Sequence, residues 1–586
     1  MCGIFGYVGK KSSAAKIVFD GLKLLEYRGY DSWGIAIKIK NKFIIEKHVG
    51  KIGDAKINLP EGDLGIGHTR WATHGGVTVA NAHPHLDCTK SITVVHNGIV
   101  ENFQEIKDKL VKLGHKFVSE TDTEVIPHLI EENLKHIGFA SSVRNSFNKL
   151  RGLNAIVVAN AVSKEIVAAK NGSPLIAGIG SGEFLVSSDI VGIVPHTRNV
   201  IFLKDNEMVI LGKEIQLISL PTGKKLSIRP EKIDWKFENT SKGKFQDFMI
   251  KEIHEQPLIV RNIAKNYSES LKKLANYVQN AKGTFFIGAG TAFHAGLSGT
   301  YFFSKIAKKH VNTTVASEFN YLEDFLTKES LVIVLSQSGE TIDVVEPVNR
   351  AKSKKSKIVA ITNSLGSTLY RMADYNVLLN AGPEKAVAST KAYIAKLSVL
   401  LMLTFALINK EERAKEILLR TAKEMERLLE SKQVLEIKKI AKFLSKTRNI
   451  YALGRGASYP SALEAALKIK EVTYIPTEGF PGGELKHGTI ALIGHGTPVI
   501  VFAPQDETYE SIISNAIEIK SRGGVIIGIS DRQSSAFDYF ISVKDVEEGS
   551  YLAQVVVAQL LAYYMAVELK LDPDMPRNLA KSVTVK

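Results

Sequence analysis

Cysteine is scarce in this sequence, since Cys2 and Cys88 are the only two among 586 residues. Two cysteines cannot build the disulfide framework of a small secreted domain, so we expect a reducing, cytoplasmic environment. No secretory signal is expected either, because Cys2 follows Met1 with no basic segment and no apolar core behind it. These features exclude the class of disulfide-stabilised extracellular proteins.

Long apolar runs are equally rare. The most apolar long segment, residues 551–569, is interrupted by Gln554 and Gln559. A membrane-spanning helix needs about 20 mostly apolar residues, so we expect a buried core helix here instead. We therefore predict that the chain does not bind a membrane.

The positive charge of the chain is not concentrated in one arm. The 76 Lys and Arg exceed the 61 Asp and Glu by 15, and the densest basic cluster, residues 352–357, follows a helical pattern. Such a cluster is typical of a solvated helix end, so we predict no nucleic-acid partner. The excess is compatible with anionic small-molecule substrates. With 45% hydrophobic and 23% charged residues, the composition excludes a disordered or fibrous chain.

The first part of the chain, residues 2–215, alternates short β-rich runs with helical patterns. Apolar residues recur at helical spacing over 14–25 and 106–113, and runs such as 64–69 favour strands. This pattern predicts an α+β domain whose sheets pack face to face. Residues 216–250 are polar and poorly periodic, so we predict a linker there.

The second part of the chain contains a repeat. Fully apolar runs alternate with long helical patterns, and two of these runs end at Gly288 and Gly454, 166 residues apart. Fully apolar strands between helices are typical of parallel sheets that are covered on both faces. We therefore predict two doubly wound α/β domains, residues 275–412 and 440–576, followed by a short tail, residues 577–586.

Cys2 is the first candidate for catalysis. Its ordinary interpretation is a small apolar residue that begins a strand. Removal of Met1 would instead place a thiol and a free α-amine on one residue, and such an amine has a pKa of about 7.7–8.0. The amine can then act as the base for its own side chain, as in an N-terminal nucleophile.

Three further positions in the first domain could bind or stabilise a substrate. Arg70, within residues 68–75 (HTRWATHG), is a planar donor suited to a carboxylate, or to an ordinary salt bridge. Asn97 and Gly98 form a strong hairpin-turn signal, or alternatively an amide and an N–H directed at an oxyanion. Asp122 is suited to a helix N-cap or to a substrate ammonium group.

A metal signal in this domain is weak. His83, His85 and Cys88 lie within six residues, but three ligands on one short stretch lack a fourth. We predict no metal and no other cofactor.

A hydroxyl-rich loop, residues 336–341 (SQSGET), follows an apolar strand and opens a helix. Helix N-termini bind phosphate through free N–H groups and the positive end of the helix dipole. The alternative, an ordinary N-cap, needs one hydroxyl, and this loop has three. The equivalent loop of the second copy, residues 503–507 (APQDE), carries acids, whereas residues 387–391 (VASTK) add a second hydroxyl-rich helix start to the first copy. We therefore predict a phosphate site in the first copy alone.

Several motifs taken together resemble known families. Residues 2–4 (CGI), 26–32 (EYRGYDS), 68–75 and 96–98 (HNG) resemble class II glutamine amidotransferases, in which the nucleophile is N-terminal. Residues 260–586 are similar to a pair of sugar-isomerase domains, and residues 576–585 (PRNLAKSVTV) resemble the end of the glutamine–fructose-6-phosphate aminotransferase family. This resemblance covers essentially the whole chain. It implies an N-terminal-nucleophile αββα sandwich followed by two doubly wound parallel-sheet sugar-isomerase domains.

The resemblance also implies a two-site enzyme. L-glutamine is hydrolysed in the first domain, and ammonia passes internally to fructose 6-phosphate, with Trp71 as a gate. The product is glucosamine 6-phosphate, and neither a metal nor a redox cofactor is implied. The family further implies a homodimer in which His487 reaches the sugar site of the neighbouring subunit.

The functional residues of the family can be placed on this sequence one by one. The residues implied in catalysis are Cys2, Asn97, Gly98, Glu471, His487 and Lys581. Those implied in glutamine binding are Arg70, Trp71, Thr73, His74 and Asp122. Those implied in sugar-phosphate binding are Thr291, Ser336, Gln337, Ser338, Thr341, Val387, Ser389 and Ala580, with Arg28 and Lys468 as further site residues. The chain departs from the family at Ala292, where relatives commonly have a serine that contacts the sugar.

Three of these residues have ordinary interpretations outside the resemblance. Glu471 is suited to a surface ion pair with Lys468, His487 to a capping or core position, and Lys581 to a solvated tail. The family implies instead that Glu471 transfers a proton, that His487 opens the sugar ring and that Lys581 forms a Schiff base.

Three other functions compete with this hypothesis. An amidophosphoribosyltransferase would need a phosphoribosyl diphosphate motif in the second half, and the sequence has none. A sugar-phosphate sensor would need neither Cys2 nor Lys581. A deglycase that acts on amino sugars would lack the first domain.

Overall fold

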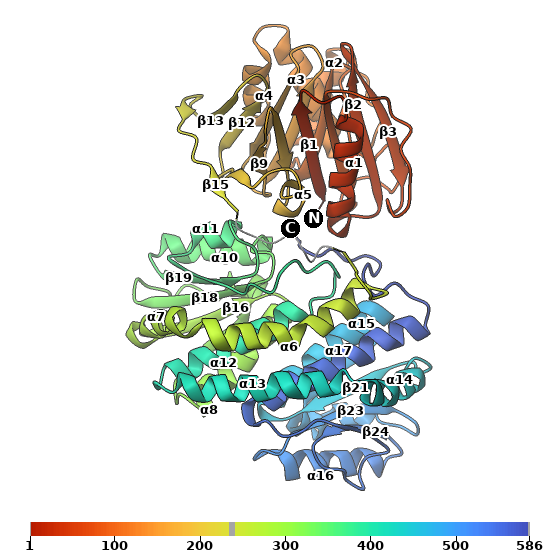
Figure 1. The fold of residues 1–586 in the computed structure, drawn as a ribbon, viewed down its shortest axis with the longest axis vertical. Helices are drawn as coiled ribbons and strands as arrows, with labels where there is room; N and C mark the ends of the chain where they lie inside the picture. The colour runs from red at the N-terminus through yellow and green to blue at the C-terminus, as the bar shows by residue number, and fades with distance from the viewer. Residues whose placement is uncertain (1, 234–240, 584–586) are drawn as a thin grey trace. The chain divides into compact units, whose positions relative to one another are not determined.

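The computed structural model describes residues 2–233 and 241–583. The chain divides into two compact units (Figure 1). The first unit consists of the residues up to 241 together with the tail from residue 580, and the second of residues 242–579. Each unit has its own fold and its own candidate site.

The described part of the first unit is built on two antiparallel sheets. In spatial order, the first sheet comprises β15 (Glu231–Lys232), β11 (Asn199–Phe202), β9 (Ile176–Ile179), β10 (Glu183–Ser187), β1 (Gly3–Gly9), β4 (Leu64–Arg70), β2 (Ser32–Ile39) and β3 (Lys42–Val49). The second comprises β14 (Lys225–Leu226), β13 (Ile215–Ser219), β12 (Glu207–Leu211), β8 (Glu165–Lys170), β7 (Asn154–Asn160), β6 (Ile92–Gly98) and β5 (His85–Leu86).

The alternation of side chains along β7 shows how these sheets pack. Ala155 and Val157 belong to an apolar core that also holds Ile4 of β1, so the two sheets face each other. Ile156 and Val158 point to the opposite face and pack in a second core. That outer face is covered by α2 (Phe103–Lys112), α3 (Val125–Leu134) and α4 (Phe139–Phe147).

Helices also cover the outer face of the first sheet. α1 (Ala14–Leu25) contacts β1, β2 and β4, and the short α5 (Ile190–Ile193) contacts β10. The order helix, sheet, sheet, helix confirms the αββα sandwich.

Part of the segment predicted to be a linker is folded into strands, so that part of the prediction is wrong. Residues 215–232 form β13, β14 and β15, and these strands extend both sheets of the first unit. Leu217 packs between the sheets whereas Ile218 packs under the outer helices, so even this polar strand alternates. β14 and β15 lie at the edges of their sheets. Edge strands tolerate polar residues, and these polar residues are the reason that the sequence did not predict the strands. The second unit already begins α6 at Phe248, and residues 234–240 of the predicted linker lie outside the described residues.

The described part of the second unit contains two parallel sheets with the same strand order. The first comprises β17 (Asn312–Val315), β16 (Gly283–Gly288), β18 (Ser330–Ser336), β19 (Lys357–Thr362) and β20 (Tyr375–Leu378). The second comprises β22 (Thr477–Pro481), β21 (Ile450–Gly454), β23 (Pro498–Ala503), β24 (Val525–Ser530) and β25 (Tyr539–Ser542). The matching order and the parallel pairing confirm the predicted duplication.

One apolar core joins the two halves of the second unit, because it contains residues from the inner faces of both sheets. The helices α6 (Phe248–Asn266), α12 (Lys391–Ala406), α13 (Glu411–Leu428) and α17 (Ser550–Glu568) contribute to it and lie between the sheets (Figure 1). The remaining helices are α7 (Ser268–Asn280), α8 (Thr291–Lys305), α9 (Ala316–Phe319), α10 (Ile342–Ser353), α11 (Thr368–Met372), α14 (Ser431–Leu444), α15 (Tyr459–Thr473) and α16 (Tyr509–Lys520).

α17 is the apolar segment that the sequence predicted to be a core helix. By length and composition alone, the span Glu547–Glu568 could cross a membrane, but 89% of its most apolar window is buried inside the structure. The prediction of a buried helix is confirmed.

Candidate active sites

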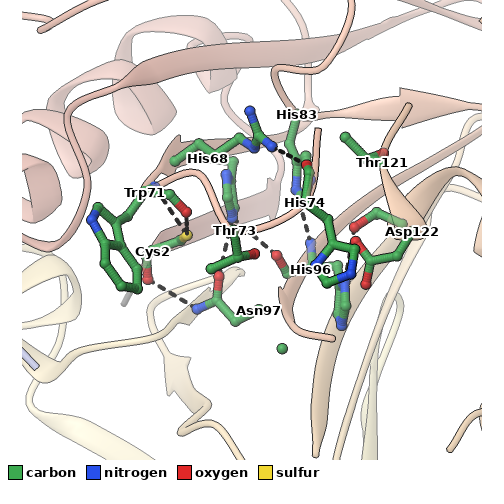
Figure 2. Close-up of a pocket in the computed structure, with 13 residues that line it drawn as sticks. Cys2, His68, Trp71, Thr73, His74, His83, His96, Asn97, Thr121 and Asp122 are labelled. Atoms are coloured by element: carbon green, nitrogen blue, oxygen red, sulfur yellow. Dashed lines mark hydrogen bonds between the residues drawn. The ribbon is translucent and has the colours of Figure 1, made fainter. Parts of the chain in front are cut away.

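A pocket in the first unit is built around Cys2 (Figure 2). Cys2 lies directly before β1, and its Sγ accepts a hydrogen bond from the backbone N–H of Trp71 at 3.2 Å. Burial raises the pKa of the Cys2 thiol, although this N–H and the charge of Arg70 act in the opposite direction. The thiol therefore needs a base before it can act as a nucleophile.

The end of β6 places Asn97 beside Cys2. Asn97 donates through Nδ2 to the carbonyl oxygen of Cys2 at 2.9 Å, and its Oδ1 lies 3.0 Å from Nε2 of His68. Burial lowers the pKa of His68 to about 3, so the ring is neutral and its Nε2–H can donate to Oδ1. His68 thus orients the amide of Asn97, a role that the sequence analysis did not assign.

Gly98 ends β6 in a conformation that favours glycine, with φ of +129°. A Cβ at this position would overlap the carbonyl oxygen of Leu153. Gly98 pairs with Asn154 of β7, and α2 follows β6, so the hairpin-turn interpretation of Asn97 and Gly98 is wrong.

Arg70 and Asp122 line the same pocket, and each already has a partner in the protein. The guanidinium of Arg70 donates to the carbonyl oxygens of His74, Gly75 and Gly76, the last two at 3.1 and 3.2 Å. These bonds fix the loop that carries Thr73 and His74 over the pocket (Figure 2). Asp122 accepts from the backbone N–H of Val100 at 2.7 Å and does not cap a helix.

The position of Cys2 is fixed from behind by Arg28. This buried guanidinium contacts the carboxylate of Asp189 at 2.6 Å, and its Nε lies 3.5 Å from the carbonyl oxygen of Cys2. On the following residues, the N–H groups of Gly3 and Ile4 donate to the hydroxyls of Thr69 and Ser188. Asp189, Thr69 and Ser188 were missed by the sequence analysis because isolated polar residues carry no periodic signal.

The neutral imidazoles under this pocket predict acid sensitivity of the first unit. Below pH 6.5 the unfolded chain binds a proton at His68 that the folded chain, with a pKa of about 3, does not bind. The free energy of unfolding should be retained above pH 6.5 and should fall by about 1.4 kcal/mol per pH unit as the pH drops from there. Burial also lowers the pKa of His83 and His85, which adds to the same trend.

Urea unfolding followed by tryptophan fluorescence measures this effect, because all three tryptophans lie in residues 1–241. The urea midpoint should be lower at pH 5 than at pH 7. Equal midpoints at the two pH values would contradict the neutral, buried state of these rings.

The second candidate site lies in the first parallel sheet of the second unit. The strand order reverses direction between β16 and β18, and these two strands pair directly. In doubly wound sheets, ligands bind at this point, outside the carboxyl ends of the strands. The loops that follow are residues 289–290 and the hydroxyl-rich segment 336–341, so the topology brings the two predicted sugar-binding segments together.

The conformation of the 336–341 loop is fixed by its own side chains. Ser336 Oγ accepts from the N–H of Gly339 at 2.9 Å, and Ser338 Oγ accepts from the N–H of Glu340 at 3.2 Å. Gly339 has φ of +68°, and a Cβ there would overlap Ser367 Oγ. Glu340 directs its carboxylate to the N–H of Thr368 at 2.8 Å, where it caps the start of α11. The Glu340 carboxylate is therefore directed to α11, and the loop can offer its hydroxyl groups to a ligand.

The equivalent loop in the second copy is occupied by acids. Asp506 accepts from the hydroxyls of Thr508 and Tyr551 at 2.7 Å each, and Glu507 pairs with Lys305 at 2.7 Å. This difference supports the prediction that only the first copy can hold a phosphate.

A buried charged cluster links the two halves of the second unit beside this site. Thr291, at the start of α8, donates to Glu464 at 3.0 Å and accepts from Lys468 at 3.1 Å. Lys468 also lies 2.5 Å from Glu471. Because Lys468 is buried, this ion pair is not the surface pair that the ordinary interpretation predicts. Burial lowers the pKa of Lys468, but the carboxylates of Glu471 and Glu464 outweigh that effect and raise it. Glu464, fully buried, was missed by the sequence analysis.

Residues 387–391 open α12 near the base of the tail. Ser389 donates to the buried carboxylate of Glu384 at 3.0 Å, and Val387 donates its N–H to the carbonyl oxygen of Asp574 at 2.9 Å. Asp574 in turn caps α6 by accepting from Phe248 and Met249 at 2.8 Å each. The tail is therefore anchored, at its base, to a segment predicted to bind the sugar phosphate.

The remaining predicted residues are not brought together with this cluster. His487 lies in an exposed turn after β22. Ala580 and Lys581 are part-buried and group with the first unit, whereas Gln337 and Thr341 belong to the second. Their meeting in one site stays a prediction.

Residues 277–406 and 443–569 each match the SIS domain family, and residues 68–195 match the glutamine amidotransferase domain family. The chain is 44% identical over 599 aligned positions to a glutamine–fructose-6-phosphate aminotransferase (isomerizing) of Pyrococcus horikoshii, with all of both chains covered. The chain belongs to the glutamine–fructose-6-phosphate aminotransferase (isomerizing) family. A member from Methanothermobacter thermautotrophicus is 42% identical, again over the full length of both chains.

A solved structure agrees with this family. The C-terminal domain of glucosamine-fructose-6-phosphate aminotransferase from Francisella tularensis is 31% identical, with a TM-score of 0.53. It covers 57% of this chain and all of that chain. The aminotransferase family therefore accounts for both units, with the amidotransferase domain in the first and the two SIS domains in the second.

Proposed function

We propose that the protein makes glucosamine 6-phosphate from L-glutamine and fructose 6-phosphate, the reaction that its family name describes. The observation that carries this proposal is the presence, in one chain, of a thiol pocket at Cys2 and a hydroxyl-rich loop at the switch point of a parallel sheet. A glutaminase alone would not need the second feature, and a sugar isomerase alone would not need the first.

In the first unit, Cys2 attacks the side-chain amide of glutamine and forms a glutamyl thioester. Met1 is removed beforehand, so that the α-amine of Cys2 takes the thiol proton and transfers it to the leaving ammonia. The amide of Asn97 and the N–H of Gly98 stabilise the oxyanion. Water then releases glutamate from the thioester. Arg70 and Asp122 bind the carboxylate and ammonium groups of glutamine, since they offer opposite charges in the lining of one pocket.

In the second unit, the loop 336–341 binds the phosphate of the sugar. His487 opens the ring, and Lys581 condenses with the ketone at C2 to form an imine with loss of water. Ammonia, which passes internally with Trp71 as the gate, replaces the lysine. Glu471, whose carboxylate lies 2.5 Å from the Lys468 ammonium, then moves a proton from C1 to C2.

We further propose that the protein is a cytoplasmic homodimer. His487 is exposed in the single chain. A second subunit would supply the histidine that each sugar site lacks.

The phosphate loop gives a prediction with a matched control. Replacing Ser338 and Thr341 by alanine should raise KM for fructose 6-phosphate by at least about a hundredfold, because two hydrogen bonds to a charged group are lost and each contributes about 1.5–3 kcal/mol. Thr341 and Thr508 are both N-cap residues, of α10 and α16. Thr508→Ala should therefore leave this KM unchanged. Equal effects in both copies would mean that these hydroxyls only cap helices.

The proposed function itself is tested by mixing the purified protein with glutamine and fructose 6-phosphate. Glutamate and glucosamine 6-phosphate should form in equal amounts. Formation of glutamate without an amino sugar would mean that the protein is only a glutaminase, and would overturn the proposal.

A further inference from the structure

Four metal-binding side chains converge on one point in the first unit, apart from the glutamine pocket. They are Cys88, His115, His128 and Glu131, and one ligand atom from each lies within 4.8 Å of every other. The sequence analysis considered Cys88 with His83 and His85, but the structure separates them. His83 stacks on His68 at 4.3 Å, and His85 contacts Thr121 at 3.1 Å.

The distances within the cluster match a tetrahedral zinc site. Zinc bonds of about 2.0–2.1 Å to nitrogen and about 2.3 Å to sulfur, at tetrahedral angles, separate two nitrogens by about 3.3 Å and a nitrogen from sulfur by about 3.6 Å. The Nδ1 atoms of His115 and His128 are 3.3 Å apart. Cys88 Sγ lies 3.7 and 3.6 Å from these same two atoms.

The carboxylate of Glu131 completes the fourth corner. Its Oε2 lies 3.2 Å from His115 Nδ1 and 3.4 Å from His128 Nδ1. The backbone N–H of Cys88 donates to this oxygen at 3.1 Å and so fixes the carboxylate next to the thiol. Two nitrogen atoms, one sulfur and one oxygen therefore surround one centre. Each of these distances between two ligand atoms is close to the distance expected in a tetrahedral zinc site.

An outer carboxylate orients one of the two imidazoles for metal binding. His115 directs Nε2 to the carboxylate of Glu132 at 2.7 Å, which leaves Nδ1 as the unprotonated ligand atom. Nε2 of His128 lies 3.9 Å from the carboxylate of Glu124, which is too far for a hydrogen bond. A carboxylate behind a ligating histidine is the usual partner that fixes the tautomer at zinc sites. Both histidines are buried, whereas Cys88 is exposed and gives an ion access from solvent.

We propose that Cys88, His115, His128 and Glu131 bind one Zn²⁺ per chain as a closed, structural site. Mixed sulfur, imidazole and carboxylate ligands favour zinc over Mg²⁺ or Ca²⁺, which prefer oxygen ligands alone. The four residues come from the turn between β5 and β6, the segment after α2, and α3. The ion therefore ties together three segments that are separate in sequence.

This site supports the glutamine pocket from outside. α3 follows directly after the turn of residues 121–123, which lines the pocket and carries Asp122. Because four protein ligands leave no open position, the ion takes no part in the reaction and positions α3 instead. This inference does not depend on the proposed function, since it concerns metal binding by residues outside both candidate active sites.

Cobalt is the probe that tests the site directly. The full-length protein is stripped with a chelator and titrated with Co²⁺, which reports a cobalt–thiolate bond by a charge-transfer absorption band. The band should saturate at one Co²⁺ per chain and should disappear on addition of Zn²⁺. Zinc content after reconstitution, measured by mass spectrometry of the metal, should also be one per chain. The zinc-loaded protein should show a higher Tm than the stripped protein.

Variants separate this site from the other thiol and from nearby histidines. Cys88→Ser and His128→Gln should lose the band and the zinc-dependent rise in Tm, whereas Cys2→Ala and His136→Gln should keep both. His136 is an exposed histidine just beyond α3 and is the matched control. A band that survives Cys88→Ser, or depends on Cys2, would overturn the proposal. Should these variants fail to fold, less than one tenth of an equivalent of zinc in the reconstituted wild-type protein would overturn it as well.

Discussion

Cys2→Ala should abolish glutamine hydrolysis while the isomerisation of fructose 6-phosphate continues. Loss of a covalent nucleophile removes the thioester route itself, so we expect glutamate release to fall by at least about a thousandfold. The phosphate loop and Glu471 belong to the second unit, which has its own core, so the sugar chemistry should not depend on the thiol. Glutamate release and glucose 6-phosphate formation, measured in separate assays, give the two rates.

The structure also explains why this variant should remain folded. Cys2 precedes β1, and the strand is held by the hydroxyls of Thr69 and Ser188 on the backbone of Gly3 and Ile4. Intact-mass analysis of active wild-type protein should show that Met1 is absent. Loss of both activities in a folded Cys2→Ala protein would argue against separate half-sites, and full activity with Met1 retained would exclude the α-amine as the base.

Lys581→Arg should remove synthase and isomerase activity and leave glutaminase activity intact. A guanidinium keeps the positive charge but does not form an imine, because it stays protonated and delocalised. We expect a fall of at least about a thousandfold in glucosamine 6-phosphate formation, since no covalent intermediate remains. Lys570→Arg, the same change at an exposed lysine after α17, should have no effect.

The anchoring of the tail supports this role. A mobile tail lysine has no fixed position for catalysis. Here Asp574 is bonded to the start of α6 and to Val387, and Arg577 packs over the ring of Tyr474 at 4.2 Å. Lys581 therefore follows within a few residues of two fixed points. Borohydride reduction in the presence of fructose 6-phosphate should trap the sugar on Lys581, as read by peptide mass spectrometry. Trapping on another lysine, or an active Lys581→Arg enzyme, would remove Lys581 from the mechanism.

Much of the fold was predictable because apolar residues recur along the sequence in clear patterns. The fully apolar β16 and β21 end 166 residues apart, and the structure places them at the same position in two sheets of identical order. The strands β13 to β15 were not predictable, because they are short and rich in polar residues, and β14 and β15 also lie at sheet edges, where polar residues are tolerated. Their sequence is that of a linker, and only pairing with neighbouring strands makes them part of a sheet.

The candidate sites likewise contain residues that were predictable from the sequence and residues that were not. Cys2 and the 336–341 loop stood out because a local motif is sufficient to suggest their chemistry. The roles of His68 and Glu464 depend on partners that are distant in sequence, namely Asn97 and Thr291. The zinc cluster was missed for that reason, since its ligands lie in three separate segments without a regular metal-binding spacing.

The central claim is that the amide nitrogen of glutamine becomes the amino group of the sugar without leaving the enzyme. The most direct measurement uses glutamine labelled with ¹⁵N in the amide, fructose 6-phosphate and an excess of unlabelled ammonium. Mass spectrometry of the glucosamine 6-phosphate should show nearly complete ¹⁵N incorporation, because ammonia released at Cys2 reaches the sugar before it mixes with solvent. Product that carries mainly unlabelled nitrogen would contradict internal transfer, and with it the coupling of the two sites.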